Sequence, residues 1–265
     1  MLRDKESSYG SSTVYKAMSV LDAIANERRP MSAAEIAQNL KMNGSSIYRL
    51  LSTLVRSNYL TQERGTSKYF LGHKILMLSA ILLESMDVRQ IARPLMTALM
   101  HKTKEAIHLL TLEGTEGVDI ERVTSSQSIQ MISNVGRRES LHASSAGKAI
   151  LAFLPEHRIE EIIGAGLQRF TANTIVDPSY LREHLRDIRA RGYAIDDVEG
   201  ENGVRCIGTA VFNHLGVPKY GISIAGPAYR LSIERLLGFT GDLLETASRI
   251  SEALGYMPDE NIMVK

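Results

Sequence analysis

The stretch NGSSIYRLLSTLVRSNYL, residues 43–60, decides how the first part of the chain folds. Read as a helix, it places its large apolar residues on a 3.6-residue period, so they form one buried stripe: Ile47, Leu50, Leu51, Leu54 and Val55. The opposite face carries hydroxyl and guanidinium groups but no carboxylate: Ser45, Ser46, Tyr48, Arg49, Ser52 and Arg56. Such a face suits a polyanion better than it suits plain water.

The segments on either side extend this helix into a small domain. Upstream, apolar residues at three- and four-residue spacing predict a helix over 12–26: Val14, Ala17, Met18, Leu21, Ile24 and Ala25. Ser32 and Glu35 form a capping-box pattern that opens a short helix, and a turn with Gly44 follows. Downstream, LTQERGTSKYFLG (60–72) alternates and turns at 64–66, as a β-hairpin does. Together these elements predict a winged helix-turn-helix, whose second helix lies in the major groove of double-stranded DNA.

The candidate DNA-binding residues lie at the turn, on the outward face of the second helix and in the hairpin: Ser32, Lys41, Asn43, Gly44, Ser45, Ser46, Tyr48, Arg49, Thr53, Arg64 and Lys68. Arg64 and Lys68 stand at the hairpin tip, within reach of phosphates. Residues 1–85 carry 11 Lys and Arg against 7 Asp and Glu, whereas residues 86–265 carry 20 against 23. The competing interpretation is a small helical subdomain with a solvated face.

Composition limits the class of protein. A chain of 265 residues with 44% hydrophobic residues suggests two domains rather than one. Its apolar runs are too short to span a bilayer, and its single cysteine, Cys206, excludes an internal disulfide framework and a cysteine-based zinc cluster. We expect a cytoplasmic protein without a cofactor or a membrane partner. The expected boundaries are 1–72 for the DNA-binding domain, 73–87 for a linker helix and 88–265 for a second domain.

The linker is strongly apolar through Ile75, Leu76, Leu78, Ile81 and Leu82. A partner helix or packing between the two domains of one chain would explain it equally well. Beyond it, strands are expected in AIHLLTL, VDIERVTS, SIQMISNV, GYAIDD, VRCIGTAVF and YGISIAG. Helices are expected near 88–103, 144–154, 179–191 and 232–254. Meandering strands flanked by helices predict an α+β domain with one sheet.

The loop LHASSAGKAI, residues 141–150, holds the candidate ligand site. It is no P-loop, because that motif needs a glycine at His142 and a serine or threonine at Ala149. A strand that leads through small residues into a helix leaves the amides near Ser144, Ser145 and Ala146 free for an anion, and a carboxylate bound there needs no arginine. The alternative is that Ser144 only caps the helix.

Four motifs in order resemble the IclR family of bacterial transcriptional regulators: residues 14–62, GRRESLHASSAGKAILAFLP, GYAIDDVEGENGVRCIGTAVF and GISIAGP. The resemblance covers residues 12–255 and leans toward the family's sugar-acid subgroup. It implies a GAF-like effector domain, a linker that pairs two chains, and a homodimer or dimer of dimers that binds a small organic acid. It also implies an effector site at His142, Ser144, Ser145, Ala146, Asp196, Cys206 and Ser223. Ala225 departs from the serine that relatives often carry, so a hydrogen bond to the effector is lost there.

Two other classes of protein compete with a DNA-binding regulator. An enzyme could pair Cys206 with His142 or His214, or Asp196 with a histidine, but a lone cysteine in an apolar strand is usually a small core residue. The seven histidines show no metal-ligand spacing. A ligand-sensing module without DNA binding conflicts with the N-terminal domain. The prediction is therefore no enzyme, but a repressor of a catabolic operon whose operator binding responds to a small carboxylate or sugar-acid-like effector.

Overall fold

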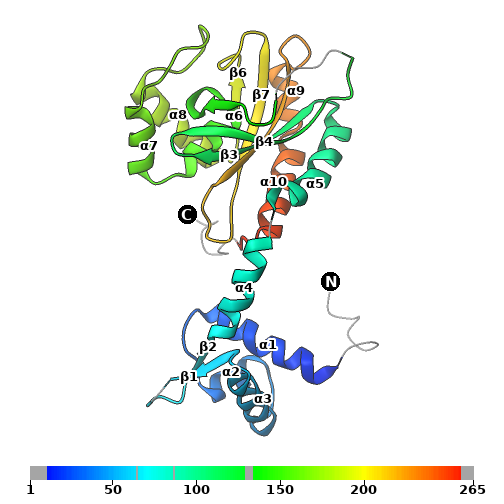
Figure 1. Cartoon of the computed structure of the whole chain (residues 1–265), viewed down its shortest axis with the longest axis vertical. Helices are drawn as coiled ribbons and strands as arrows, with labels where there is room; N and C mark the ends of the chain where they lie inside the picture. Colours follow the sequence, from blue (N-terminus) through cyan, green and yellow to red (C-terminus); the bar gives the residue numbers. More distant parts are fainter. Residues whose placement is uncertain (1–10, 64, 86, 129–133, 258–265) are drawn as a thin grey trace. The chain divides into compact units, whose positions relative to one another are not determined.

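The computed structural model describes residues 11–63, 65–85, 87–128 and 134–257. The chain divides into two compact units, residues 1–86 and 87–265 (Figure 1). Each unit has its own cluster of buried apolar side chains. Over the described ranges, none of the helices has the length and apolar character needed to cross a membrane.

The first unit is the expected helix-turn-helix with a hairpin. Its elements are α1 (Ser12–Glu27), α2 (Ala33–Asn39), α3 (Gly44–Arg56), β1 (Leu60–Gln62), β2 (Tyr69–Leu71) and α4 (His73–Ser85). The capping box at α2 is confirmed, since the Glu35 amide donates to Ser32 Oγ at 3.2 Å and the Ser32 amide donates to Glu35 Oε2 at 2.7 Å. Asn43 caps α3 by accepting from the Ser46 amide at 2.9 Å. These caps satisfy amides that a helix start would otherwise leave without a partner.

The buried stripe of α3 is confirmed. Ile47, Leu51 and Leu54 are buried, and Leu50 and Val55 pack against the same core. The stripe expected for α1 is wrong in part, because Val14, Met18 and Ala25 are exposed. Ile24 is buried as expected, and Ala17 and Leu21 pack against the core. Helix α1 also buries Val20 and Ala23, which the expected stripe did not include.

The second unit is built on a six-stranded antiparallel sheet, which confirms the α+β prediction. Its strand order is β5-β4-β3-β8-β7-β6. The bounds are β3 (Ala106–Glu113), β4 (Glu116–Val123), β5 (Arg138–Ser140), β6 (Ala194–Asp197), β7 (Val204–Val211) and β8 (Tyr220–Pro227). The expected strand SIQMISNV lies mostly outside the described residues.

Helices cover the sheet on both sides, with α6 (Ser145–Phe153) on one and α5 (Val88–Thr103) and α10 (Thr240–Ala253) on the other (Figure 1). Because both faces are covered, successive residues of the central strands β3, β7 and β8 are buried. Where the structure describes this unit, it also contains α7 (Glu156–Gly164), α8 (Pro178–Arg191), α9 (Ile233–Gly238) and a 3-10 turn at Leu141–Ala143. The single helix expected over 232–254 is wrong, since α9 ends before Phe239 and α10 begins after it.

Two glycines let α6 lie directly on the sheet. A Cβ atom at Gly208 in β7 would lie 2.6 Å from the amide nitrogen of Ala146, and one at Gly221 in β8 would lie 2.8 Å from the Ala146 carbonyl oxygen. Real side chains do not tolerate such distances to backbone atoms. The start of α6 is therefore fixed against the middle of the sheet.

A β-bulge in β4 decides which side chains face α6. Leu109 pairs with Glu121, but the next residue, Leu110, pairs with Asp119, so Ile120 is an extra residue in β4. Residues that pair across strands point to the same face. The bulge therefore turns Asp119 toward the face that carries Leu110.

Candidate functional site

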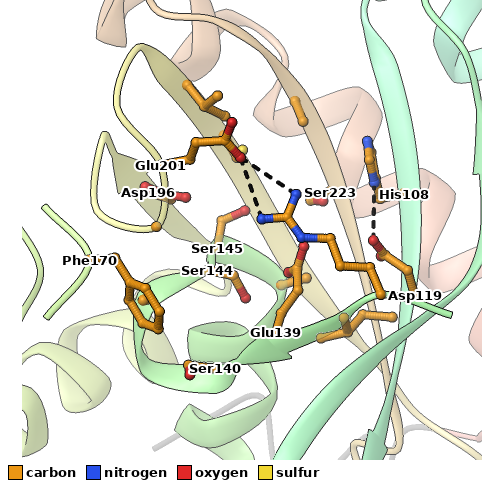
Figure 2. Close-up of a pocket in the computed structure, with 18 of the residues that line it drawn as sticks. His108, Asp119, Glu139, Ser140, Ser144, Ser145, Phe170, Asp196, Glu201 and Ser223 are labelled. Carbon is orange, nitrogen blue, oxygen red and sulfur yellow. Dashed lines mark hydrogen bonds and ion pairs between the residues drawn. The ribbon is translucent and has the colours of Figure 1, made fainter. Parts of the chain in front are cut away.

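The second unit encloses a cavity of about 290 Å³ between the sheet and the start of α6. Strands β3 to β8 and the loops that follow β6 and α7 all contribute to it (Figure 2). Its lining side chains include His108, Asp119, Arg137, Arg138, Glu139, Ser144, Ser145, Phe170, Asp196, Glu201, Cys206, Ser223 and Ala225. A volume of this size suits a small metabolite.

Six of the seven residues predicted for the effector site line this cavity: Ser144, Ser145, Ala146, Asp196, Cys206 and Ser223. Strand register explains why three of them meet. Asp196 in β6 pairs with Cys206 in β7, which pairs with Ala225 in β8. Ser223 lies two residues before Ala225 and pairs with His108 in β3. One face of the sheet therefore carries Asp196, Cys206, Ser223 and His108 close together.

His142 is the exception, and the structure corrects its placement. Its side chain is buried outside the lining of the cavity, and its Nε2 atom lies 2.9 Å from the carbonyl oxygen of Gln168. Burial lowers the pKa of His142. The 3-10 turn at Leu141–Ala143 rotates His142 away from the cavity, while Ala143 lines it.

Ser144 caps the start of α6, as in the alternative interpretation of the loop 141–150. Ser144 Oγ accepts from the Gly147 amide at 3.1 Å, so Ser144 is the N-cap residue as well as a lining residue. Ala146 also lines the cavity, but its Cβ atom lies toward Gly221 in β8. A larger side chain at Ala146 would therefore strain the packing of α6 on the sheet.

Acidic side chains dominate the lining: Glu116, Asp119, Glu139, Asp196 and Glu201, against Arg137, Arg138 and His108. Arg138 pairs with Glu116 at 2.8 Å, and Arg137 pairs with Glu201 at 3.4 Å. In the described part of the chain, neither Glu139 nor Asp196 has a Lys or Arg within ion-pair distance. The inner part of the cavity thus offers hydrogen-bond acceptors rather than cations.

Two buried polar atoms at this inner part lack partners. Among the described residues, His108 Nε2 and Asp119 Oδ2 have no hydrogen bond. His108 Nδ1 lies 3.7 Å from Asp119 Oδ2, too far for a hydrogen bond (Figure 2). Because a buried polar atom without a partner is costly, the pair is suited to a polar ligand that would complete it.

Burial favours the neutral forms of several lining groups. It raises the pKa of Asp196 to about 7, although a backbone hydrogen bond from Glu199 opposes this shift. Burial and then the charge of Asp119 raise the pKa of Glu139. Burial, followed by the charge of Asp196, raises the pKa of the Cys206 thiol. Cys206 is therefore a protonated thiol at neutral pH, which disfavours a role as a nucleophile.

Asp196→Asn is expected to raise the free energy of unfolding at pH 8 by about 1–3 kcal/mol. The raised pKa means that the folded state binds the proton more tightly than the unfolded chain. The contribution of protonated Asp196 to the stability of the parent is therefore full below about pH 4 and is lost as the pH rises toward 7. The substitution should therefore gain more at pH 8 than at pH 5. Urea unfolding of both proteins, followed by circular dichroism at pH 5 and pH 8, measures the difference. The exposed Asp187→Asn serves as the control, and a gain that is equal at both pH values would contradict the assignment.

Sequence reasoning missed most of the charged residues of the cavity, among them His108, Asp119, Arg137 and Glu139. His108 could have been found, because a histidine within the apolar strand AIHLLTL needs a polar neighbour. Asp119 could not, since its direction depends on the bulge at Ile120. Arg137 and Glu139 precede the loop that was recognised, but nothing in their spacing indicates which side of the chain faces the ligand.

The candidate DNA-binding residues that the structure describes lie at the surface of the first unit. Tyr48, Arg49 and Thr53 are exposed on α3, and Lys41, Asn43, Gly44 and Ser45 are exposed at the turn before it or at its start. Ser32, Ser46 and Lys68 are half-buried. The Ser32 hydroxyl is already used as a helix cap, and the Thr53 hydroxyl donates to the Arg49 carbonyl oxygen at 2.9 Å. Arg64 lies outside the described residues.

Both units match families of known proteins. Residues 13–64 match the family described as the IclR helix-turn-helix domain, and residues 80–252 match the one described as bacterial transcriptional regulator IclR C-terminal.

Full-length relatives give the same result. The HTH-type transcriptional regulator KdgR of Escherichia coli strain K12 is 35% identical over 246 residues, which covers 92% of this chain and 93% of that protein. The HTH-type transcriptional repressor AllR of Klebsiella pneumoniae is 34% identical over 94% of this chain and 92% of its own length. The crystal structure of the Thermotoga maritima IclR protein shares 35% identity and a TM-score of 0.62, and the match covers 92% of this chain and 99% of that one.

Proposed function

This chain belongs to the IclR family of bacterial transcriptional regulators, and from that premise we propose that it is a cytoplasmic repressor of a catabolic operon that releases its operator when a small organic acid binds. The observation that carries the proposal is the match of both units to this one family, with a small polar cavity in the second unit. Relatives named as repressors support the direction of regulation.

Helix α3 is the part that enters the major groove in this proposal. Its outward face carries Tyr48, Arg49 and Arg56 without an acidic neighbour, and its start exposes Ser45. Arginine on such a face can donate two hydrogen bonds to a guanine base, while hydroxyl groups near the helix start can donate to phosphates. The hairpin β1–β2 adds Lys68 as a phosphate contact.

Arg49→Ala is expected to weaken binding to the operator by ~1–3 kcal/mol without unfolding the first unit, because the side chain is exposed. The operator is obtained by selecting duplexes from a random pool with the parent protein. Binding is then compared by fluorescence anisotropy at one salt concentration. Arg186→Ala in the second unit removes the same charge and is the matched control. Equal affinity of parent and Arg49→Ala would remove Arg49 from the interface.

The second unit supplies the sensor. A cavity of about 290 Å³ with serine hydroxyls at Ser145 and Ser223 and acceptors at Asp196 and Asp119 fits a small hydroxy acid better than an aromatic ligand. No catalytic step is assigned to it, because the raised pKa of Cys206 keeps that thiol protonated. The experiment is operator binding titrated with organic acids, and an operator complex that no acid alters would contradict the sensor role.

Pairing of two chains completes the proposal. Helix α4 exposes Leu76, Met77, Leu78 and Ile81, with 72% of Leu76 and 65% of Ile81 accessible in the single chain. Helix α1 adds the exposed Val14, Tyr15 and Met18. Clusters of exposed apolar side chains such as these are typical of interfaces. A homodimer would present two copies of α3 to two half-sites. The oligomeric state, dimer or dimer of dimers, can be measured by analytical ultracentrifugation.

A further inference from the structure

The buried carboxyl group of Asp196 lies near the start of α6 (Figure 2). A Cβ atom placed at Gly200 would lie 2.7 Å from the carbonyl oxygen of Ala143 and 3.5 Å from Asp196 Oδ2. Ala143 directly precedes Ser144, the residue that caps α6. Asp196 is therefore a neighbour of the helix start at which the sequence predicts a bound carboxylate.

The first turn of α6 holds amide donors that the helix itself does not use. The Gly147 amide donates to Ser144 Oγ at 3.1 Å, and the Lys148 amide donates to the Ser144 carbonyl oxygen at 2.9 Å. Ser145 and Ala146 precede both of these donors in the chain, and both residues line the cavity. An acid bound by the amides of Ser145 and Ala146 can therefore also contact the side chains at this end of the cavity.

Acids outnumber cations around Asp196. The titratable groups that surround it are Lys148 of α6, Glu139 of β5, Cys206 of β7, and Glu199 and Glu201 of the loop after β6. Lys148 already binds Glu199, so its charge is compensated. The Cys206 thiol is neutral. Within the described ranges, Asp196 has no Lys or Arg at ion-pair distance, and its Oδ1 atom accepts from the Glu199 amide at 2.6 Å.

An acid bound at α6 would place a second carboxylate beside Asp196. Two carboxylates that share one buried site cannot both stay ionised. Burial already raises the pKa of Asp196 to about 7 in the ligand-free chain. A proton on Asp196 removes the conflict, because a neutral carboxyl donates through one oxygen and still accepts through the other. A hydrogen bond from a carboxyl to a carboxylate is also short and strong.

We propose that the effector's carboxylate binds as a pair with the protonated carboxyl of Asp196, so that binding of each acid takes up one proton from solvent. This inference rests on the proposed role of the cavity as an acid sensor. It makes Asp196 a hydrogen-bond donor to the acid, whereas an ionised Asp196 can only accept. The response to the acid should then weaken as the pH rises, since binding requires the protonated form.

The pH dependence of acid binding has a definite sign. The free chain loses the proton of Asp196 near pH 7, and above that pH each acid that binds must bring the proton back. The dissociation constant of the parent should therefore rise about tenfold between pH 6 and pH 8. The carboxyl group of an ordinary organic acid ionises at much lower pH, so it does not contribute to this change.

Isothermal titration calorimetry of the full chain counts the proton directly. The probes are pyruvate, D-lactate, D-gluconate and D-glucuronate. The acid that binds best is measured at pH 8 in HEPES and in Tris, two buffers whose ionisation enthalpies differ. The difference in binding enthalpy should correspond to about one proton taken up per acid at pH 8, and to about a tenth of a proton in MES and Bis-Tris at pH 6. This measurement needs no variant, so it does not depend on whether a substitution folds.

Asp196→Asn keeps a donor at the same place but cannot titrate. In this variant the dissociation constant should change by less than about twofold between pH 6 and pH 8, without proton uptake. Glu139→Gln removes the other buried acid beside the start of α6, and its proton count should remain that of the parent. Glu183→Gln on the exposed face of α8 is the matched control away from the cavity and should reproduce the parent in both measurements.

Two results would overturn the pairing while leaving the acid sensor in place. One is an acid that binds the parent at pH 8 without proton uptake. The other is proton uptake that persists in Asp196→Asn, because the proton would then belong to another group. If none of the four acids binds the parent at pH 6 or pH 8, the acid-sensor proposal fails, and the pairing fails with it.

Discussion

Lys148→Met is expected to lower the free energy of unfolding of the second unit by ~3–5 kcal/mol. Lys148 is completely buried in α6, where its Nζ donates to the Ile195 carbonyl oxygen at 2.7 Å and to Glu199 Oε1. Removing the ammonium group leaves the Glu199 carboxylate buried without a cation, and Oε2 of that carboxylate already lacks a hydrogen-bond partner among the described residues. The penalty comes from this uncompensated charge rather than from lost volume, since methionine fills most of the space.

The double variant Lys148→Met with Glu199→Gln separates the two causes. Because it removes both charges, it should recover most of the lost stability. Urea unfolding followed by circular dichroism gives the free energies, and amide hydrogen exchange in β7 and β8 assigns the change to the second unit. A double variant as unstable as Lys148→Met alone would mean that packing, and not charge, explains the loss.

Leu51→Ala is expected to destabilise the first unit by ~2–5 kcal/mol. Leu51 is fully buried in α3 and belongs to a core that includes Val20, Ile36 and Ile47. This core is small, so the surrounding side chains can fill only part of the cavity left by the substitution. DNA binding should fall as well, because α3 would no longer be held in one orientation.

The neighbouring Ser52→Ala is the matched control for Leu51→Ala. Ser52 is exposed on the same helix, and its substitution should change stability by less than ~0.5 kcal/mol. Thermal unfolding followed by circular dichroism, with hydrogen exchange of α1 to α3, distinguishes the first unit from the second. Similar stability of Leu51→Ala and Ser52→Ala would contradict the assignment of Leu51 to the core.

The first unit could be predicted almost completely, because its signals are local. The capping box at Ser32 and Glu35 and the stripe of α3 lie within one or two helical turns. The face expected for α1 was wrong in part, for a physical reason. Its apolar residues surround much of the helix, so periodicity alone does not choose between the face with Val20 and the face with Met18.

The site in the second unit could be predicted only where one loop supplies it. Ser144, Ser145 and Ala146 follow from the start of a helix, whereas the contributions of Asp196, Cys206 and Ser223 came from family resemblance. The acids that give the cavity its character depend on strand order and on the bulge that turns Asp119 inward. The spacing of residues within one segment does not reveal which distant strand it pairs with. For this reason Arg137 and Glu139 were missed.

The strand order also limits the sequence in which the newly made chain can fold. Strand β3 lies between β4 and β8, and its pairing of His108 with Ser223 joins positions far apart in the sequence. As the chain leaves the ribosome, the hairpin β3–β4 can form early, but one edge of β3 stays open until β8 emerges. The DNA-binding unit can therefore be complete while the sensing unit is unfinished. During that interval the chain would hold a folded helix-turn-helix before the cavity that binds the effector exists.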